Sequence, residues 1–320
     1  MKAPGAEFVL LTGFLGSGKT TLLRHFLSRP EAADTAVIVN EVGEIGLDGV
    51  ILRETGSDTP IAMLSNGCIC CQASNDLAAI IDTLLAMERP IPSVPLRRII
   101  LETSGLSKPG PVLRQLATLA ERRLRVAVVA TFDAVRGTQV GAYEEAVAQW
   151  AAAHRIVITK ADAVSSDRLK AAKAEVEALN PLSEIVATAD REYAVTGAFS
   201  PLPRITPLIE PPRIANGAAH PRVSVCLAQP TGALAYADLA AWLDNIAGAL
   251  GERLLRLKGL VRVTDCEQPL LVQSVGTVFS AARPFDLRKA SASPFLVIIA
   301  RDLRVAELEA VSPRGSFVIS

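Results

Sequence analysis

Residues 13–20 read Gly13-Phe14-Leu15-Gly16-Ser17-Gly18-Lys19-Thr20 and follow the apolar run 8–11 after one residue, Thr12. These residues have the phosphate-binding loop spacing G-x-x-x-x-G-K-[ST]. A strand-like segment precedes the loop, and a helix-like segment follows it. Glycines allow successive backbone N–H groups to turn inward around a triphosphate, and the N-terminus of the following helix adds the positive end of its dipole. The stretch therefore predicts a nucleotide site.

The polar groups of this loop have separate expected roles. Lys19 is expected to reach the β and γ phosphates, and Thr20 to bind Mg²⁺ through its hydroxyl, because Mg²⁺ prefers hard oxygen ligands. The alternative is a chance match in a glycine-containing turn, which the strand–loop–helix context disfavours. The nucleotide-binding residues predicted in this stretch are Gly13, Gly16, Ser17, Gly18, Lys19, Thr20 and Thr21.

Composition describes a globular chain with balanced charge. Its 320 residues are 50% hydrophobic, enough to bury a sizeable core in one or two domains. Lys+Arg and Asp+Glu number 33 each, so nucleic acid and acidic membranes are not expected partners. No apolar run approaches the ~20 residues of a membrane span. The first apolar run leads into the phosphate loop and not into a signal-peptide cleavage site, so we expect a cytoplasmic protein.

Strand-like and helix-like patterns alternate after the loop. Continuous apolar strands separated by amphipathic helices predict an α/β domain over residues 1–190, with a mostly parallel sheet covered on both faces and ligands at the carboxyl ends of the strands. The predicted strands are 35–40, 61–64, 96–101, 126–131 and 156–158, and the predicted helices lie near 77–85, 112–120, 144–152 and 168–179.

A proline-rich stretch separates this region from a second one. Periodicity is lost over residues 191–222, where prolines accumulate, so we predict a linker there. Residues 223–320 are expected to form a smaller α+β domain with strands at 223–227, 260–263, 270–278 and 295–300. Trp242 lies on an apolar helical stripe, which favours a core position over a partner-binding face.

Two carboxylates are candidate catalytic groups besides Lys19. Glu102 ends a predicted buried strand, where phosphate-loop enzymes place the carboxylate that holds Mg²⁺. Gly105 follows and would let its backbone N–H approach a γ phosphate, although the same residues also fit a helix-capping sequence. Glu41, in the glycine-punctuated loop 41–49, is a candidate for positioning water or Mg²⁺.

The stretch Thr159-Lys160-Ala161-Asp162 follows another predicted strand. The Asp162 carboxylate can accept hydrogen bonds from the N1–H and N2–H₂ groups of guanine, while the Lys160 stem covers the ring. Adenine lacks that pair of donors, so this stretch predicts guanine recognition. The alternative is an ordinary helix start.

Three of the five cysteines lie within four positions, at Cys68, Cys70 and Cys71. Their thiolates suit Zn²⁺, Cu⁺ or another thiophilic ion, and three ligands are too few to close a tetrahedral structural site. An open ligand position is what metal exchange requires. A redox cluster and buried thiols remain as alternatives.

Five motifs in this order make the chain resemble the CobW family of metal-chaperone GTPases: residues 12–21, 40–44, 65–71, 102–106 and 159–162. The resemblance extends to the C-terminal region through residues 254–261 and 295–302. It implies a GTP-dependent metallochaperone or metal-centre assembly factor, related to the urease and hydrogenase nickel-insertion GTPases. It also implies that Cys68, Cys70 and Cys71 are the metal ligands. Thr159 stands where the guanine motif commonly has Asn, and the predicted linker lacks the histidine tract that some members carry.

The expected function is therefore a GTPase switch for metal transfer. We expect it to use GTP and Mg²⁺, to bind Zn²⁺ or Co²⁺, and to pass that metal to a client metalloprotein or a metal-cofactor assembly enzyme; homodimerisation is left open. One alternative is a nucleotide-regulated metal sensor that delivers nothing. Another is an ATP-using phosphate-loop kinase, in which Asp162 and the cysteines would have no role.

Overall fold

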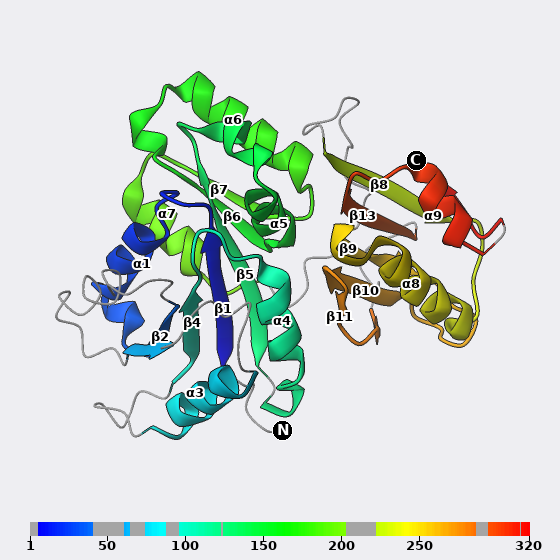
Figure 1. Ribbon diagram of the computed structural model, residues 1–320, viewed down its shortest axis with the longest axis horizontal. Coiled ribbons are helices and arrows are strands. Elements are labelled where there is room, and N and C mark those ends of the chain that lie inside the picture. Colours follow the sequence, from blue (N-terminus) through cyan, green and yellow to red (C-terminus); the bar gives the residue numbers. More distant parts are fainter. Residues whose placement is uncertain are drawn as a thin grey trace. The chain divides into compact units, whose positions relative to one another are not determined.

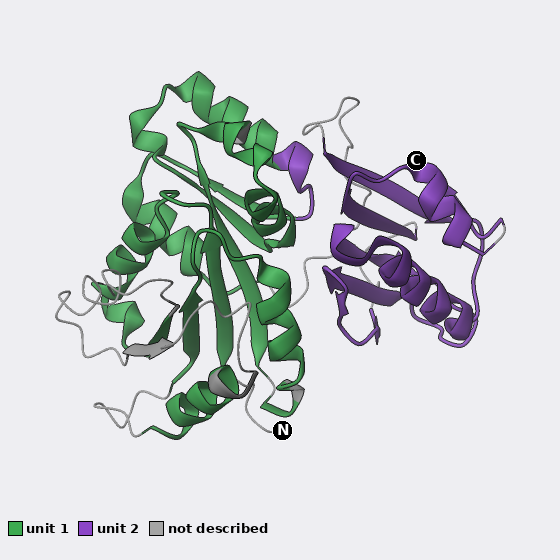
Figure 2. Ribbon diagram, in the orientation of Figure 1, with its two compact units in different colours: residues 1–176, 183–202 green, residues 177–182, 203–320 purple. Residues whose placement is uncertain are grey.

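The computed structural model describes residues 6–40, 61–64, 74–87, 96–122, 124–202, 222–285, 294–313 and 315–320. The chain divides into two compact units, shown in different colours in Figure 2. The first unit comprises Met1–Val176 and Ser183–Leu202, and the second comprises Glu177–Leu182 and Pro203–Ser320.

The first unit is built on a parallel sheet with the strand order β3-β2-β4-β1-β5-β6-β7 (Figure 1). Every pair of neighbouring strands in it is parallel, as predicted from the alternating apolar runs. All the strands therefore end at one edge of the sheet. Their bounds are β1 Glu7–Gly13, β2 Thr35–Asn40, β3 Ile61–Leu64, β4 Arg98–Glu102, β5 Arg125–Asp133, β6 Arg155–Thr159 and β7 Glu184–Ala187.

Helices cover both faces of this sheet (Figure 1). On one face, Phe26 of α1 stacks on Phe199 of α7, with their ring centroids 4.4 Å apart. On the other, Trp150 of α5 packs on Phe132 of β5, with centroids 4.9 Å apart. The helices of this unit are α1 Lys19–Leu27, α3 Ser74–Ala86, α4 Pro109–Ala117, α5 Glu144–Ala152, α6 Ser166–Leu179 up to Val176, and α7 Arg191–Phe199.

The predicted linker begins too early. Its first nine residues, Arg191–Phe199, form α7, whose side chains Val195, Ala198 and Phe199 are buried in the core of the first unit. This helix is too short to show a clear helical repeat of apolar residues. It is stabilised mainly by packing against the core of the sheet, which the local sequence pattern does not reveal. A local signal was present, because the Asp190 carboxylate caps the helix by accepting from Tyr193 N. Linker residues 203–221 lie outside the described residues.

The second unit is an α+β domain, as expected, with an antiparallel sheet of order β11-β10-β9-β13-β8-β14 in which β12 also pairs with β10. The predicted strand 270–278 is instead two strands joined by a turn at Gly276, whose φ of 55° lies in the left-handed region. The bounds are β8 Val223–Pro230, α8 Tyr236–Leu250, β9 Leu254–Val261, β10 Leu270–Val275, β11 Val278–Phe279, β12 Arg283–Pro284, β13 Phe295–Arg301, α9 Val305–Val311 and β14 Phe317–Ile319.

Trp242 belongs to the core of the second unit, which confirms the sequence prediction. Its side chain is fully buried in α8 and stacks on Phe317 with ring centroids 3.7 Å apart. Its Nε1 donates to the Ser312 hydroxyl at 2.8 Å, so the one polar atom of the indole is satisfied. The large apolar surface of Trp242 therefore stabilises the fold of this unit.

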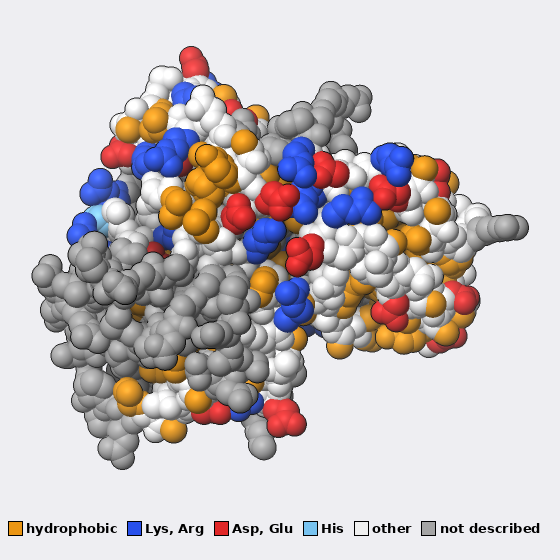
Figure 3. All heavy atoms as spheres, viewed as in Figure 1, with side chains coloured by type: hydrophobic (Ala, Val, Ile, Leu, Met, Phe, Trp, Pro, Cys, Tyr) orange, Lys and Arg blue, Asp and Glu red, His pale blue; other side chains and the backbone are white. Residues whose placement is uncertain are grey.

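On the face shown in Figure 3, the acidic and basic side chains of the described residues are interspersed and form no large patch of a single charge. This agrees with the balanced composition. No helix within the described ranges is both long and apolar enough to cross a bilayer.

Strand β9 buries two cations, Arg256 and Lys258. Burial, together with the positive charges of Arg256 and Arg283, lowers the pKa of Lys258 from 10.5 to about 8. Burial likewise lowers the pKa of Arg256, to about 10. A cation in such an environment costs free energy in the folded state.

This cost predicts a pH-dependent stability. Between pH 8 and 10.5 the unfolded chain holds a proton on Lys258 that the folded chain has lost, so stability should rise with pH in this window. Lys258→Met should abolish that rise and stabilise the protein at pH 7 by up to about 3 kcal/mol. Urea unfolding at several pH values measures both effects. The control is Lys170→Met, whose side chain is exposed, and equal pH slopes in wild type and Lys258→Met would contradict the prediction.

Candidate functional site

The phosphate loop connects the end of β1 at Gly13 to the start of α1 at Lys19. Gly16 and Gly18 have φ values of 69° and 90°, which side-chain-bearing residues rarely adopt. At Gly13 a Cβ would overlap the hydroxyl of Thr131 on β5. The glycines of the motif are therefore required by the curvature of the loop and by its close approach to β5.

Lys19 places its ammonium group inside the curve of the loop. Its Nζ donates to the carbonyl oxygens of Gly13 at 2.8 Å and Phe14 at 3.3 Å, and the side chain is mostly buried. A cation held at this point lies where the sequence predicts the β and γ phosphates to bind.

Thr20 and Glu102 meet across the end of the sheet. The Thr20 hydroxyl donates to Glu102 Oε1 at 2.6 Å, and Glu102, the last residue of β4, is 4% exposed. Hydroxyl and carboxylate oxygens are the hard ligands that Mg²⁺ prefers. The two residues fit a Mg²⁺ ion held beside the nucleotide phosphates, and we assign that role to them as a prediction.

The segment after β4 lies directly on the phosphate loop. A Cβ built on Gly105 would be 2.7 Å from both the backbone N and the Cδ2 of Leu15, so glycine is required by close packing. The segment is held by Gln149 of α5, whose Nε2 donates to the carbonyls of Gly105 at 3.0 Å and Ser107 at 2.9 Å. Gln149 is fully buried. Gln149 was not predicted from the sequence, although a glutamine within an otherwise apolar helix face is a signal.

The predicted base-recognition loop begins where β6 ends. The Thr159 hydroxyl donates to the backbone oxygen of Ser17 at 2.8 Å, so this loop is joined to the phosphate loop. Lys160 adopts the left-handed conformation, with a φ of 56°. Asp162 is 60% exposed and lies 3.7 Å from the Nη2 of Arg191, which follows β7. Its carboxylate is therefore accessible to a ligand.

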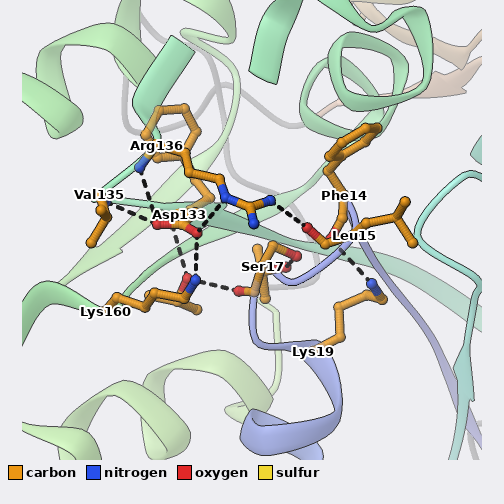
Figure 4. Close-up of polar contacts among 11 residues, drawn as sticks. Phe14, Leu15, Ser17, Lys19, Asp133, Val135, Arg136 and Lys160 are labelled. Atoms are coloured by element: carbon orange, nitrogen blue, oxygen red, sulfur yellow. Dashed lines mark hydrogen bonds and ion pairs between the residues drawn. The ribbon is translucent and has the colours of Figure 1, made fainter. Parts of the chain in front are cut away.

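Three further polar residues of the site come from β5 and the turn after it. Thr131 Oγ1 lies 2.6 Å from the Ser17 hydroxyl, and Asp133 accepts from Lys160 Nζ at 2.6 Å. Arg136 Nη1 donates to the Leu15 carbonyl at 2.9 Å, as Figure 4 shows. None of these three residues was predicted from the sequence, because the apolar run of β5 indicates only a buried strand.

The predicted metal cysteines Cys68, Cys70 and Cys71 lie outside the described residues, and so does Glu41. Their roles stay predictions. Within the described ranges, no group of three or more His, Cys, Asp or Glu side chains is arranged to hold a metal ion. Cys226 is buried in the second unit, and its burial raises the pKa of its thiol.

The packing of Gly105 yields a testable prediction. Gly105→Ala should push the segment after β4 away from Leu15, because the added methyl group has no space there. Overpacking costs about 1–3 kcal/mol, and if a triphosphate binds only with the segment in its original position, its binding should weaken by roughly 5- to 150-fold. Titration with a non-hydrolysable nucleoside triphosphate measures the change. Gly110→Ala is the matched control, since its nearest neighbour would be Arg114 Nη1 at 3.7 Å; equal affinities in the two variants would contradict the packing argument.

Comparison with known proteins agrees with this geometry. The family description "CobW/HypB/UreG, nucleotide-binding domain" matches residues 7–187, and "Cobalamin synthesis protein cobW C-terminal domain" matches residues 223–311. The zinc chaperone YjiA of Escherichia coli (strain K12) is 30% identical over 282 residues, covering 85% of this chain and 86% of that protein. The zinc chaperone CobW of Pseudomonas aeruginosa is 29% identical, covering 93% and 88% of the two chains.

A solved structure shows the same fold. The crystal structure of Zn(II)-bound YjiA GTPase from E. coli superposes with a TM-score of 0.71 at 22% identity, covering 97% of this chain and 98% of that one. Family matches in both units and relatives that span most of the chain agree with the motifs described above. The chain belongs to the CobW family of metal-chaperone GTPases.

Proposed function

We propose that this protein hydrolyses GTP to control the binding of a thiophilic transition metal, Zn²⁺ or Co²⁺, which it delivers to a client metalloprotein or a metal-cofactor assembly enzyme. The main support for this proposal is that two predicted motifs, the Mg²⁺ carboxylate and the base-recognition loop, both contact a third, the phosphate loop, at one edge of the sheet. Glu102 contacts Thr20 at 2.6 Å, and Thr159 contacts Ser17 at 2.8 Å, so the Mg²⁺ and base loops both meet the phosphate loop.

The base loop supports guanine as the base. Asp162 presents an accessible carboxylate beyond the end of β6, and a carboxylate accepts hydrogen bonds but cannot donate them. Guanine offers two adjacent donors, whereas adenine offers no such pair. The ATP-using kinase alternative leaves this carboxylate without a function.

The phosphate side supports hydrolysis. The Lys19 ammonium is positioned to neutralise the charge that develops on the phosphates. Bound Mg²⁺ would supply further charge stabilisation, and Thr20 and Glu102 would hold it. In this proposal Gly105 brings backbone N–H groups near the γ phosphate, and Glu41 positions water.

The sheet register supports communication with the metal motif. Leu64, the last residue of β3, pairs with Asn40 of β2, while Glu102 pairs with the neighbouring Val39. The chain thus leaves β3 at the edge that carries Glu102, four residues before Cys68. The relatives YjiA and CobW both carry the name zinc chaperone, which favours Zn²⁺ and delivery over a metal sensor that delivers nothing.

The guanine assignment predicts base selectivity. GTP should bind more tightly than ATP, and Asp162→Ala should weaken GTP binding by about 10- to 100-fold, because hydrogen bonds to a charged group are lost. ATP binding should change little. Calorimetry with both nucleotides tests this, with Asp167→Ala, which removes an exposed carboxylate on α6, as the control. Equal wild-type affinities for GTP and ATP would overturn the assignment.

The metal switch predicts reciprocal coupling between the two ligands. If the γ phosphate changes the geometry of the thiolates, metal affinity should differ between the GTP and GDP states by roughly 5- to 150-fold. Metal should change the affinity for GTP relative to GDP by the same factor, because linkage is reciprocal. The measurement is titration of Zn²⁺ and Co²⁺ against a competing chelator, in protein loaded with GDP or a non-hydrolysable GTP analogue.

Two cysteine variants distinguish the effect of the predicted metal ligands from that of thiols elsewhere in the chain. Cys70→Ser should weaken metal binding and remove the coupling, while Cys266→Ser, outside the motif, should leave both unchanged. Indistinguishable metal affinities in the two nucleotide states would contradict the switch even if GTP hydrolysis is confirmed.

A further inference from the structure

Asp133, the last residue of β5, holds a buried carboxylate at the centre of the site (Figure 4). Its side chain is 5% exposed. Oδ1 accepts from the backbone N–H groups of Val135 at 2.9 Å and Arg136 at 3.2 Å. Oδ2 accepts from Lys160 Nζ at 2.6 Å and lies 3.8 Å from Arg136 Nε. A buried charge is tolerated when it is paired and hydrogen-bonded in this way.

The first of the two sets of Asp133 contacts, the ion pair with Lys160, leads to the predicted base-recognition loop, residues 159–162. Lys160 has a left-handed backbone conformation that costs a non-glycine residue free energy and persists only where its surroundings hold it. The ion pair with Asp133 is such a restraint. Lys160 is 40% exposed, so without Asp133 its ammonium group would turn toward water. The aliphatic stem would then leave the position in which it is expected to cover the purine.

The second set of Asp133 contacts leads to the phosphate loop. Through its contacts with the backbone N–H groups after β5, Asp133 shapes the turn that carries Arg136. Arg136 donates to the Leu15 carbonyl at 2.9 Å, and its Nη2 is 3.5 Å from the position that a Cβ would take at Gly16. The guanidinium of Arg136 thus stabilises the phosphate loop by binding one of its carbonyl groups, and this contact is called the Arg136 brace below.

We propose that Asp133 is a positioning residue for guanine-nucleotide binding, which sets the Lys160 stem for the base and the Arg136 brace for the phosphate loop. This inference rests on the proposed GTPase function and names a residue that the motifs of that function do not include. Asp133 acts through Lys160 and Arg136 and needs no contact with the nucleotide.

The two sets of contacts predict different losses. Asp133→Asn should weaken GTP binding by about 10- to 100-fold, because a charged hydrogen bond is lost, and should lower the ratio of GTP to ATP affinity. Lys160→Met keeps the aliphatic stem but removes the ammonium group, and should also lower that ratio. Arg136→Met should weaken GTP and ATP binding alike, because the brace contacts a part of the loop that both nucleotides share.

The experiment is calorimetric titration of the full chain with Mg²⁺–GTP and Mg²⁺–ATP, in wild type, the three variants and the double variant Asp133→Asn/Lys160→Met. If the pair acts as a unit, the loss in the double variant should be smaller than the product of the two single losses. The matched control is Glu184→Gln, which neutralises the partner of Arg155 at the opposite end of β6. Thermal unfolding of each variant reports folding separately.

The outcomes separate this inference from the function on which it rests. A lower GTP to ATP ratio in folded Asp133→Asn, with an unchanged ratio in Glu184→Gln, supports it. A wild type that prefers GTP and an Asp133→Asn variant with the same preference would overturn the role of Asp133 alone. Multiplicative losses in the double variant would also overturn it. Equal wild-type affinities for GTP and ATP would instead overturn the guanine assignment.

Discussion

The shape of the phosphate loop depends on donors outside it that engage its carbonyl groups. The N–H and C=O of one peptide unit point in opposite directions. Arg136 binds the Leu15 carbonyl, so the N–H of Gly16 points away from Arg136; Thr159 binds the Ser17 carbonyl, so the N–H of Gly18 points away from Thr159. Arg136 after β5 and Thr159 at the end of β6 therefore help to direct these N–H groups to the side of the loop where the phosphates are predicted to bind. A glycine-rich turn alone has little to fix this arrangement.

Local sequence predicted the parts of the site whose chemistry depends on short spacing. The phosphate loop is recognisable because its glycines, Lys19 and Thr20 stand at fixed offsets from one another. Glu102 and Thr159 were identified because each ends a continuous apolar run, and the structure places both at strand ends. Trp242 was assigned to a core because helical periodicity is a local property. In each case the deciding interaction spans few residues.

The parts that were missed depend on strand order. Asp133 and Lys160 are 27 positions apart, and they meet because β5 and β6 are parallel neighbours with Asp133 in register with Thr159. Gln149 reaches Gly105 over 44 positions. An apolar run reveals a buried strand but not its neighbours, so neither contact follows from periodicity. Helix α7 was not predicted for a related reason, because its burial depends on packing against the sheet and not on its own short sequence.

The two sides of the site are held by interactions of different strength. On the base side, the buried Asp133 carboxylate accepts a charge-assisted hydrogen bond from Lys160, and such bonds contribute about 1.5–3 kcal/mol. On the γ-phosphate side, the segment after β4 is held to α5 by the neutral amide of Gln149, and such bonds contribute only about 0.5–1.5 kcal/mol each. On the γ-phosphate side Thr20 also donates to the Glu102 carboxylate at 2.6 Å, so a nucleotide-dependent rearrangement costs least in the segment after β4. That side includes Glu102, whose partner strand β2 also pairs with β3, the strand that precedes the cysteine motif. We therefore expect the base side to remain a fixed platform, while loss of the γ phosphate is sensed at the end of the sheet from which the metal motif departs.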